Sequence, residues 1–497
     1  MRRPRWLVRG VVSLAVLAAV TGALPGVVGA SAAAVRPASA PSWSRCPDAV
    51  GSHPAQCADI RVPLSWARPG GRTISLHLSR LPALDPAHRV GVLLFNPGGP
   101  GGPGAETVAE AGRNLFTPSL QRRFDIIGFD PRGVGKSTAV RCTGAALSAR
   151  VPVFPRTSGQ FAAIARHSAA YAAGCAAHSV PGLLAHVDTV SAARDVDAIR
   201  GALHQRRINW LGLSYGTYLG QTYARLFPHR VRAMVLDGAI DHATGPRAFL
   251  WQEASSLSAV FGRFARWCGS STSCALHGQD VLAGWDQLLA RAARQPLPAP
   301  HATGGPTTVS ADAIRMVLPN LLLFGPSSPL TTWPTLGKAL AAAQAGDASL
   351  LADNSAVGRP QPAYTAVGCQ DFPPQFHGYR DAAARLAVAR AVSPHTGGAS
   401  EAWEVADLCA GWPVRPADPW AYQPIVGAPP ILVASASHDP STPLAWALGL
   451  HREIAGSGLL IADVTGHTAY ANSACARSTE TTYLLTDRLP ANDHCDA

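Results

Sequence analysis

A serine in this sequence stands where a chain can present a nucleophile. Ser214 lies in Gly-Leu-Ser-Tyr-Gly at 212–216. The run 207–213 has the pattern of a short buried strand, and 215–227 has that of a helix that ends before Pro228. A Gly-x-Ser-x-Gly at a strand-to-helix junction is typical of a nucleophile elbow, where a sharp turn lifts the serine above the sheet and the glycines avoid collisions. We therefore predict that Ser214 is a catalytic nucleophile for acyl transfer.

The base and the acid that such a serine needs are expected further along the chain. Asp439 follows 430–436, which has the pattern of a buried strand, and His467 follows the next such run, 459–464. Because parallel strands end at one edge of a sheet, both side chains should lie near Ser214. The order serine, acid, histidine is one of those that natural triads use. We predict Asp439 as the acid and His467 as the base.

An earlier strand offers rivals for the acid. Asp237 and Asp241 follow the apolar run 231–236. A triad is defined by geometry and roles rather than by sequence position. Both residues therefore stay alternatives to Asp439.

Two backbone N–H groups are expected to stabilise the oxyanion that forms when a serine attacks a carbonyl. One should come from Tyr215, the residue after the nucleophile, and the other from the glycine-rich loop 96–102, which follows an earlier strand. Glycines let the backbone approach the substrate closely, and the prolines among them stiffen the loop. We predict Gly99 as the loop donor, with Gly98 next.

Two other glycine motifs could suggest a bound nucleotide, and both fail on physical grounds. The segment Gly133-Val-Gly-Lys-Ser137 has Asp130 where a phosphate-binding loop needs its first glycine. Residues 99–104 fit Gly-x-Gly-x-x-Gly, but Pro100 and Pro103 have no N–H group to offer a pyrophosphate. The cysteine spacings fit no zinc site. We predict neither a cofactor nor a metal.

The elements around these residues indicate an α/β fold. Short apolar runs bounded by Gly, Pro and Asp have the pattern of buried parallel strands, and stripes such as that of 189–203 indicate helices between them. The alternation predicts a mostly parallel central sheet with helices on both faces. We expect the core at 41–241 and 429–497. Residues 242–428 break the alternation, and we expect them to form a large, mainly helical lid.

The first forty residues have the pattern of a targeting segment rather than of a folded one. An arginine-rich start precedes the apolar stretch 11–28, and small residues follow up to position 40, which is the pattern of a secretory signal peptide. Gly22, Pro25 and Gly26 interrupt the stretch, which argues against a membrane anchor. Export with cleavage predicts a secreted protein that leaves the membrane. Disulfides are then expected for the 10 cysteines, with their pairing left open.

Composition excludes several other classes of protein. The 497 residues are 47% hydrophobic and only 15% charged, which rules out a disordered or fibrous chain. The net charge of +11 is compatible with a nucleic-acid partner. However, the arginines are scattered, and no basic run interleaved with aromatics follows residue 10. We predict no nucleic-acid binding, and nothing in the sequence indicates an oligomeric state.

Six motifs occur together in order and carry a resemblance to a known family. They are Asn-Pro-Gly-Gly-Pro-Gly-Gly at 96–102, Phe-Asp-Pro-Arg-Gly-Val-Gly-Lys-Ser at 129–137, Gly-Leu-Ser-Tyr-Gly-Thr at 212–217, Leu-Asp-Gly at 236–238, Asp-Pro-Ser-Thr-Pro at 439–443 and Gly-His at 466–467. From about residue 45 to Cys495, the chain resembles the secreted tripeptidyl aminopeptidase-like serine hydrolases of actinobacteria, which are related to prolyl aminopeptidases. Pro103 departs from the family pattern, where a serine is expected, and this bears on the shape of the loop.

The resemblance implies an α/β-hydrolase fold with Ser214, Asp439 and His467 as nucleophile, acid and base. It also implies a peptide substrate with a free N-terminus, from which a short unit such as a tripeptide is removed. A prolyl aminopeptidase or a carboxylesterase on the same scaffold remains an alternative. In a different class, a non-catalytic binding protein is disfavoured, because binding-only relatives usually lose a member of the catalytic set.

An exopeptidase of this kind needs a carboxylate that binds the terminal ammonium and a lid that excludes longer chains. The acids considered in the lid are Glu253, Asp371, Glu401, Glu404 and Asp407. If Cys369 and Cys409 pair, the disulfide would brace the segments that carry some of these acids. We predict Asp371 and Glu404 as the ammonium ligands.

Overall fold

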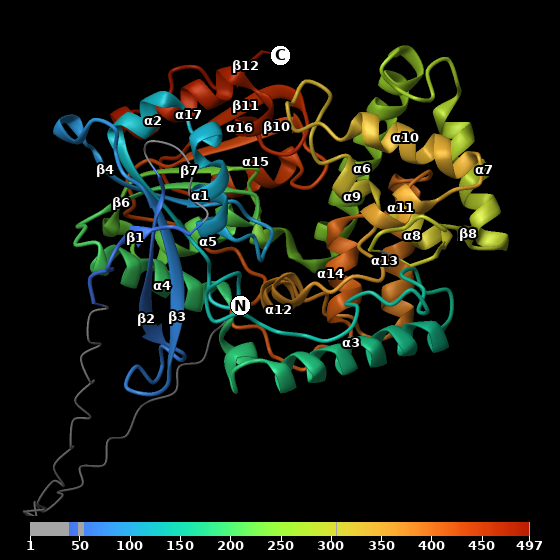
Figure 1. Cartoon of the computed structure of the whole chain (residues 1–497), viewed down its shortest axis with the longest axis horizontal. Helices are drawn as coiled ribbons and strands as arrows, with labels where there is room; N and C mark the ends of the chain where they lie inside the picture. The colour runs from blue at the N-terminus through green and yellow to red at the C-terminus, as the bar shows by residue number, and fades with distance from the viewer. Residues whose placement is uncertain (1–38, 48–53, 305, 497) are drawn as a thin grey trace, which may run out of the picture. The chain divides into compact units, whose positions relative to one another are not determined.

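The computed structural model describes residues 39–47, 54–304 and 306–496. Within these ranges one large sheet runs in the order β1-β2-β3-β5-β4-β6-β7-β10-β11-β12 (Figure 1). Its strands are β1 (Ser44–Arg45), β2 (Gln56–Pro63), β3 (Thr73–Leu81), β4 (Gly91–Asn96), β5 (Phe124–Phe129), β6 (Ile208–Leu213), β7 (Val231–Asp237), β10 (Leu432–His438), β11 (Gly458–Thr465) and β12 (His494–Cys495). Neighbours from β5 to β12 pair in parallel, whereas β1, β2, β3 and β5 pair antiparallel. This confirms the predicted α/β fold.

Each face of the sheet has its own hydrophobic core, because successive residues of a strand point to opposite sides. In β4, Val92 and Leu94 belong to one core, and Leu93 and Phe95 belong to the other. Helices α4 (Thr189–Ala202), α5 (Tyr215–Leu226) and α15 (Leu444–Glu453) contribute to the first core. Helices α1 (Gly104–Leu115), α2 (Pro118–Arg123) and α17 (Ala474–Thr486) contribute to the second. Helices therefore cover both faces, as expected.

The chain between β7 and β10, in which the lid was predicted, is mainly helical (Figure 1). A short hairpin, β8 (Leu297–Pro298) with β9 (Thr308–Val309), lies among these helices. Helix α3 (Ser158–His178) precedes the predicted lid in sequence, yet it packs against α13 and α14. The helices between β7 and β10 are α6 (Gly245–Ser270), α7 (Val281–Arg294), α8 (Ala311–Arg315), α9 (Leu318–Leu321), α10 (Trp333–Gln344), α11 (Ser349–Asn354), α12 (Pro362–Asp371), α13 (Tyr379–Val392) and α14 (Glu401–Cys409).

All the cysteines are paired, and the structure gives the pairing that the sequence left open. Cys369 and Cys409 join the ends of α12 and α14, as the lid argument supposed. The other disulfides are Cys46–Cys57, Cys142–Cys175, Cys268–Cys274 and Cys475–Cys495. Each of them therefore closes a loop within one region of the sequence.

The Phe-Asp-Pro-Arg motif after β5 braces the loops around it. The Asp130 carboxylate accepts hydrogen bonds from the N–H groups of Ala105 (3.0 Å) and Lys136 (2.8 Å), which holds the start of α1. The fully buried Arg132 is paired with Asp195 at 2.6 Å. The residues that resembled a phosphate-binding loop therefore have structural partners of their own.

The predicted signal peptide, residues 1–40, lies outside the described residues except for its last two positions. Across the described ranges, no helix is both long enough and apolar enough to cross a bilayer.

Candidate active site

Ser214 occupies a strained turn between β6 and α5. Its backbone has φ of 57° and ψ of −126°, a left-handed conformation that a side chain other than glycine rarely adopts. A Cβ at Gly212 would lie 2.3 Å from the carbonyl oxygen of Gly216, and a Cβ at Gly216 would lie 2.5 Å from that of Asn96. Both glycines are therefore sterically required. This is the geometry expected of a nucleophile elbow.

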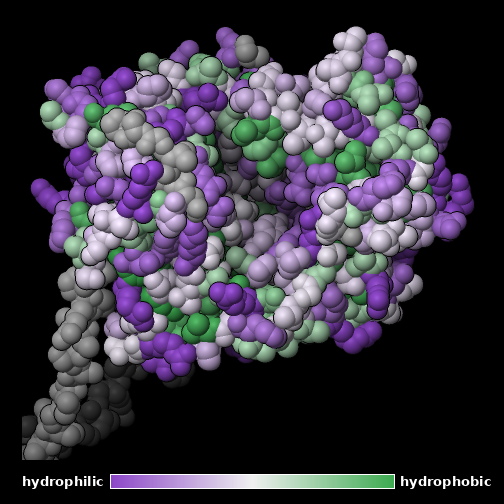
Figure 2. Space-filling view, in the orientation of Figure 1, coloured by the Kyte–Doolittle hydropathy of each residue, from purple (hydrophilic) through white to green (hydrophobic). Residues whose placement is uncertain are grey.

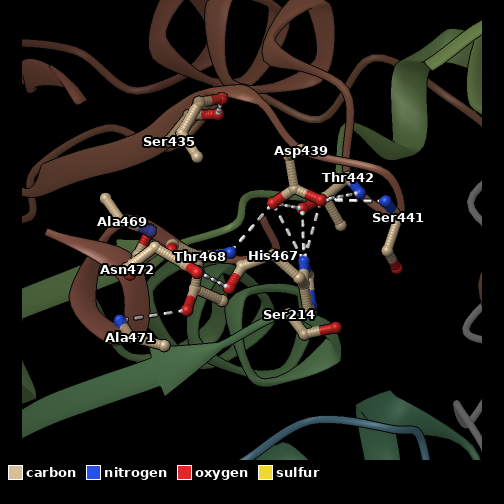
Figure 3. Close-up of polar contacts among 12 residues, drawn as sticks. Ser214, Ser435, Asp439, Ser441, Thr442, His467, Thr468, Ala469, Ala471 and Asn472 are labelled. Atoms are coloured by element: carbon tan, nitrogen blue, oxygen red, sulfur yellow. Dashed lines mark hydrogen bonds and ion pairs between the residues drawn. The ribbon is translucent and has the colours of Figure 1, made fainter. Parts of the chain in front are cut away.

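His467 and Asp439 lie in direct contact next to Ser214 (Figure 3). Nδ1 of His467 is 2.9 Å from each carboxylate oxygen of Asp439. The carboxylate also accepts hydrogen bonds from the N–H groups of Ser441 (2.9 Å), Thr442 (2.8 Å) and Thr468 (3.0 Å). The Nδ1 contact leaves Nε2 as the nitrogen that can serve as the base.

Opposing effects set the charge of this pair. Burial alone would raise the pKa of Asp439, but the charge and hydrogen bond of His467, together with backbone N–H donors, bring it below its ordinary value. Burial likewise opposes a charged His467, but Asp439, followed by Glu401 and Asp237, raises the pKa of the imidazole. The site therefore stabilises the imidazolium that forms when a histidine takes the proton of a serine.

The two rival acids have other partners. The carboxylate of Asp237 accepts hydrogen bonds from the N–H groups of Ala469 (2.9 Å) and Tyr470 (2.6 Å) at the start of α16 (Ala469–Asn472). Burial raises the pKa of Asp237 to about 6. Asp241 caps a short turn through the N–H group of Ala243. Among the three acids, Asp439 is thus the one in hydrogen-bond contact with the histidine.

The glycine-rich loop after β4 lies against the elbow. A Cβ at Gly98 would lie 2.7 Å from that of Ser214, so only glycine allows this approach. The N–H group of Gly98 donates a hydrogen bond to the side chain of Asn96 at 3.0 Å, so this N–H group already has an acceptor. Gly99, the predicted donor, lines the same cavity as Ser214. The N–H group of Tyr215 is the first of α5 and has no acceptor within the helix.

A small cavity of about 40 Å³ lies over Ser214. Aromatic side chains of the lid and the core, including Phe249, Phe372 and Trp446, form much of its wall, and Glu253 and Glu401 also line it. A second, wider cavity of about 480 Å³ shares Tyr364 and Glu401 with the first. In the space-filling view this face of the molecule is hollowed between its two halves (Figure 2).

Comparison with known proteins identifies the family. Residues 91–308 match a family described as alpha/beta hydrolase fold, and residues 393–495 match one described as TAP-like protein. A tripeptidyl aminopeptidase of Streptomyces lividans is 32% identical, and the alignment covers 94% of this chain and 88% of that protein. The chain belongs to the tripeptidyl aminopeptidase-like family of α/β hydrolases. The resemblance seen in the motifs is thereby confirmed, and the chain is a serine hydrolase.

Other relatives of this chain have different names. Serine protease Hip1 of Mycobacterium tuberculosis is 32% identical, with 88% of this chain and 86% of that protein covered. Carboxylesterase B of the same organism is 34% identical, with 90% and 88% covered. The names of the relatives thus include both peptidases and an esterase.

The two acids predicted to bind the ammonium of a substrate have different surroundings. Asp371 is fully buried, and it accepts hydrogen bonds from the N–H group (3.1 Å) and hydroxyl (2.6 Å) of Thr189, on α4. It lines neither cavity, and burial raises its pKa to about 8. Glu404 lines the wider cavity and accepts a hydrogen bond from Gln361 at 2.8 Å. Burial raises the pKa of Glu404 to about 7.

Two other lid acids, Glu253 and Glu401, line the cavity of Ser214 instead. The carboxylate of Glu253, on α6, accepts hydrogen bonds from the N–H groups of Glu401 (2.7 Å) and Ala402 (2.9 Å) at the start of α14. The carboxylate of Glu401 accepts one from the hydroxyl of Ser441 at 2.6 Å. Burial is the main cause that raises the pKa of both acids. No sequence signal separates Glu401 from Glu404, because both lie in the first turn of α14 after the N-cap Ser400.

Proposed function

We propose that this serine hydrolase is an exported aminopeptidase that removes short units, tripeptides above all, from the N-termini of peptides. The contact of His467 with Asp439 beside the strained Ser214 carries this proposal. Ser214 attacks the scissile carbonyl, His467 takes its proton and passes it to the leaving amine, and Asp439 holds the imidazole in the required tautomer. The N–H groups of Tyr215 and Gly99 stabilise the oxyanion. In the second step His467 takes a proton from the water that attacks the acyl-enzyme. It then passes that proton to the oxygen of Ser214 as the acyl group leaves.

The acids that line the two cavities support an enzyme that recognises a free N-terminus. Burial leaves Glu401 and Glu404 with raised pKa values, so a bound ammonium would supply the missing positive charge and favour their ionised forms. The cavity of about 40 Å³ over Ser214 is too small for three residues. The adjoining cavity of about 480 Å³ lies in the usual range of ligand sites, ~300–1,000 Å³. We assign the ammonium to Glu404 and Glu401 rather than to Asp371.

Export is part of the same proposal. Disulfides persist in oxidising compartments, and all 10 cysteines of this chain are paired. The arginine-rich and apolar start of the sequence has the pattern of a signal peptide. These two observations support a secreted enzyme.

A carboxylesterase is the second candidate function, and one observation favours it. The relative named Carboxylesterase B is 34% identical to this chain. Ester hydrolysis requires the same nucleophile, base and oxyanion donors, but no ammonium site. A prolyl aminopeptidase would require the ammonium site close to Ser214.

A panel of chromogenic substrates separates these functions. Aminoacyl, prolyl, dipeptidyl and tripeptidyl amides are offered to the purified enzyme beside a simple uncharged ester, and kcat/KM is measured for each. We expect the tripeptidyl amide to be the best amide substrate. Preference for the prolyl amide would instead identify a prolyl aminopeptidase, and hydrolysis of the ester without any amide would identify an esterase.

A further inference from the structure

The lid reaches the loop that carries His467. The carbonyl oxygen of Leu323, between α9 and α10, accepts a hydrogen bond from the N–H group of His467 at 2.6 Å. The next residue, Phe324, forms an antiparallel bridge with Gly466. The backbone of the histidine loop is therefore paired with a segment that lies more than 130 positions earlier in the chain. We call residues 323–325 the lid strap.

One side chain joins the lid strap to the histidine loop. The amide nitrogen of Asn472 donates to the carbonyl oxygens of His467 (2.7 Å) and Thr468 (2.9 Å). Its amide oxygen accepts from the N–H group of Gly325 at 3.3 Å. Asn472 is 9% exposed and labelled next to this loop in Figure 3. Both ends of the amide are thus used, one on the catalytic loop and the other on the lid.

The fit between the two segments leaves no room for a side chain. A Cβ at Gly325 would lie 1.8 Å from the carbonyl oxygen of Thr465. A Cβ at Gly466 would lie 2.4 Å from the amide oxygen of Asn472 and 2.6 Å from the nitrogen of Gly325. The lid strap therefore cannot move toward the histidine loop without displacing it.

The histidine loop is short and depends on outside support. It joins β11 to α16 through Gly466, His467 and Thr468. Gly466 has φ of 129° and Thr468 has φ of 66°, and a β-branched residue in that left-handed region is strained. Such a conformation persists only where surrounding contacts hold it.

The lid also contacts the loop of the acid. The hydroxyl of Ser256, on α6, donates to the carbonyl oxygen of Asp439. Glu401, on α14, accepts from the hydroxyl of Ser441, two residues after Asp439. The acid loop is therefore tied to lid helices, and the histidine loop is tied to the lid strap.

We propose that Asn472 is a positioning residue that couples the lid strap to the histidine loop, so that the lid helps to set the place of the base. This inference rests on the proposed role of His467 as that base. A lid of this kind does more than cover the substrate, because its position determines whether His467 is aligned with Ser214. Misplacement of a catalytic group by about 1 Å can cost ~100-fold in rate.

Steady-state kinetics with a small uncharged ester tests the coupling, because such a substrate does not need the ammonium site. The variants are Asn472→Ala, which removes the link, and Gly325→Ala, whose added Cβ would meet the carbonyl oxygen of Thr465 and push the lid strap away from it. Gly262→Ala, on the lid helix α6, is the matched control, since the nearest atom to its Cβ, in the flexible side chain of Arg266, is 3.8 Å away. Ser214→Ala is the reference for loss of the nucleophile. Circular dichroism confirms that each variant is folded.

We expect kcat to fall by ~10–100-fold in Asn472→Ala and Gly325→Ala while KM stays within about threefold, because only the alignment of the base changes. The rate at which a fluorophosphonate labels Ser214 should fall in parallel, and Gly262→Ala should match the wild type. If one variant does not fold, the other decides. Wild-type kcat in a folded variant overturns the inference, while an inactive Ser214→Ala then still supports the proposed function. An active Ser214→Ala contradicts the proposed function itself.

Discussion

The acid loop and the lid both bury carboxylates, and they do so in opposite ways. Asp439 accepts hydrogen bonds from three backbone N–H groups, the hydroxyl of Thr442 and the ring of His467. Burial would raise its pKa, yet these contacts and the charge of His467 bring it below the ordinary value. The carboxylate of the acid loop is therefore charged before any substrate arrives.

Two of the lid acids receive far less compensation. Glu404 has one amide donor, Gln361, and Glu401 has one hydroxyl donor, Ser441. Burial dominates, and the pKa of each is raised. Burial therefore does not by itself define the role of an acid. The charge of His467 and several donors offset the burial of Asp439, whereas Glu401 and Glu404 have one side-chain donor each and keep raised pKa values.

The largest expected effect concerns the nucleophile. Ser214→Ala should lower kcat by ~10⁴–10⁶ without unfolding the protein, because loss of a triad member removes the covalent route. Amide hydrolysis and circular dichroism measure the two quantities. Near-normal activity in the folded variant would contradict the role of Ser214 as nucleophile, and with it the roles proposed for the acid loop and the lid.

The acid loop is tested by its central residue. Asp439→Asn should lower kcat by ~10⁴, because the amide holds the imidazole of His467 in the wrong tautomer. Asp237→Asn is the matched control, since Asp237 is equally buried but bonded to backbone N–H groups. We expect the control to retain most of the activity. If Asp237→Asn lowers kcat more than Asp439→Asn does, the catalytic acid is Asp237, at the end of the earlier strand β7.

The lid acids are tested with charged and uncharged substrates. Glu404→Gln should lower kcat/KM for a free tripeptidyl amide by ~10–100-fold, since a charge-pair partner of the ammonium is lost. Hydrolysis of a small uncharged ester should change little. Asp286→Asn, at an exposed lid position, is the control. If Glu404→Gln lowers kcat/KM equally for the amide and the ester, this acid does not bind the ammonium.

The smallest expected effect is on stability. Burial raises the pKa of Glu404 to about 7, so between pH ~4 and that value the folded state holds a proton that the unfolded chain has lost. The cost of burying this charge is absent at low pH and complete above the folded pKa, so Tm should fall as the pH rises from 5 to 8. The raised pKa of His467 acts in the same direction.

A comparison of variants isolates the contribution of Glu404 from those of His467 and of the other buried acids with raised pKa values. Thermal unfolding of Glu404→Gln should show a smaller fall in Tm from pH 5 to 8 than the wild type. Asp286→Asn should show the same fall as the wild type. A Glu404→Gln curve parallel to that of the wild type would refute the assignment of a raised pKa to this acid.

Much of the sheet edge could be predicted from the sequence. Ser214, Asp439 and His467 each follow a short apolar run, and buried parallel strands produce such runs wherever they occur. The ends of these strands meet at one edge, so position in the chain translates directly into position in space. In the structure His467 and Asp439 lie in contact at this edge.

The lid acids could not be separated in the same way. Asp371 and Glu404 both lie within a few residues of a paired cysteine, so their local sequences look alike. Their surroundings come from distant segments: Thr189, on α4, encloses Asp371, whereas Glu404 faces an open cavity. The link through Asn472 is equally invisible in sequence, because it depends on a strap from another part of the chain.

The most direct test of the account uses one peptide in two forms. A peptide of about six residues with a free N-terminus and its N-acetylated twin are incubated with the enzyme, and the products are identified by mass spectrometry. We predict release of the first three residues from the free peptide. Cleavage of the acetylated peptide should be slower by ~100-fold or more, because each 1.4 kcal/mol of lost pairing costs about tenfold. Equal cleavage of both peptides, or cleavage within the chain of the acetylated one, would contradict it.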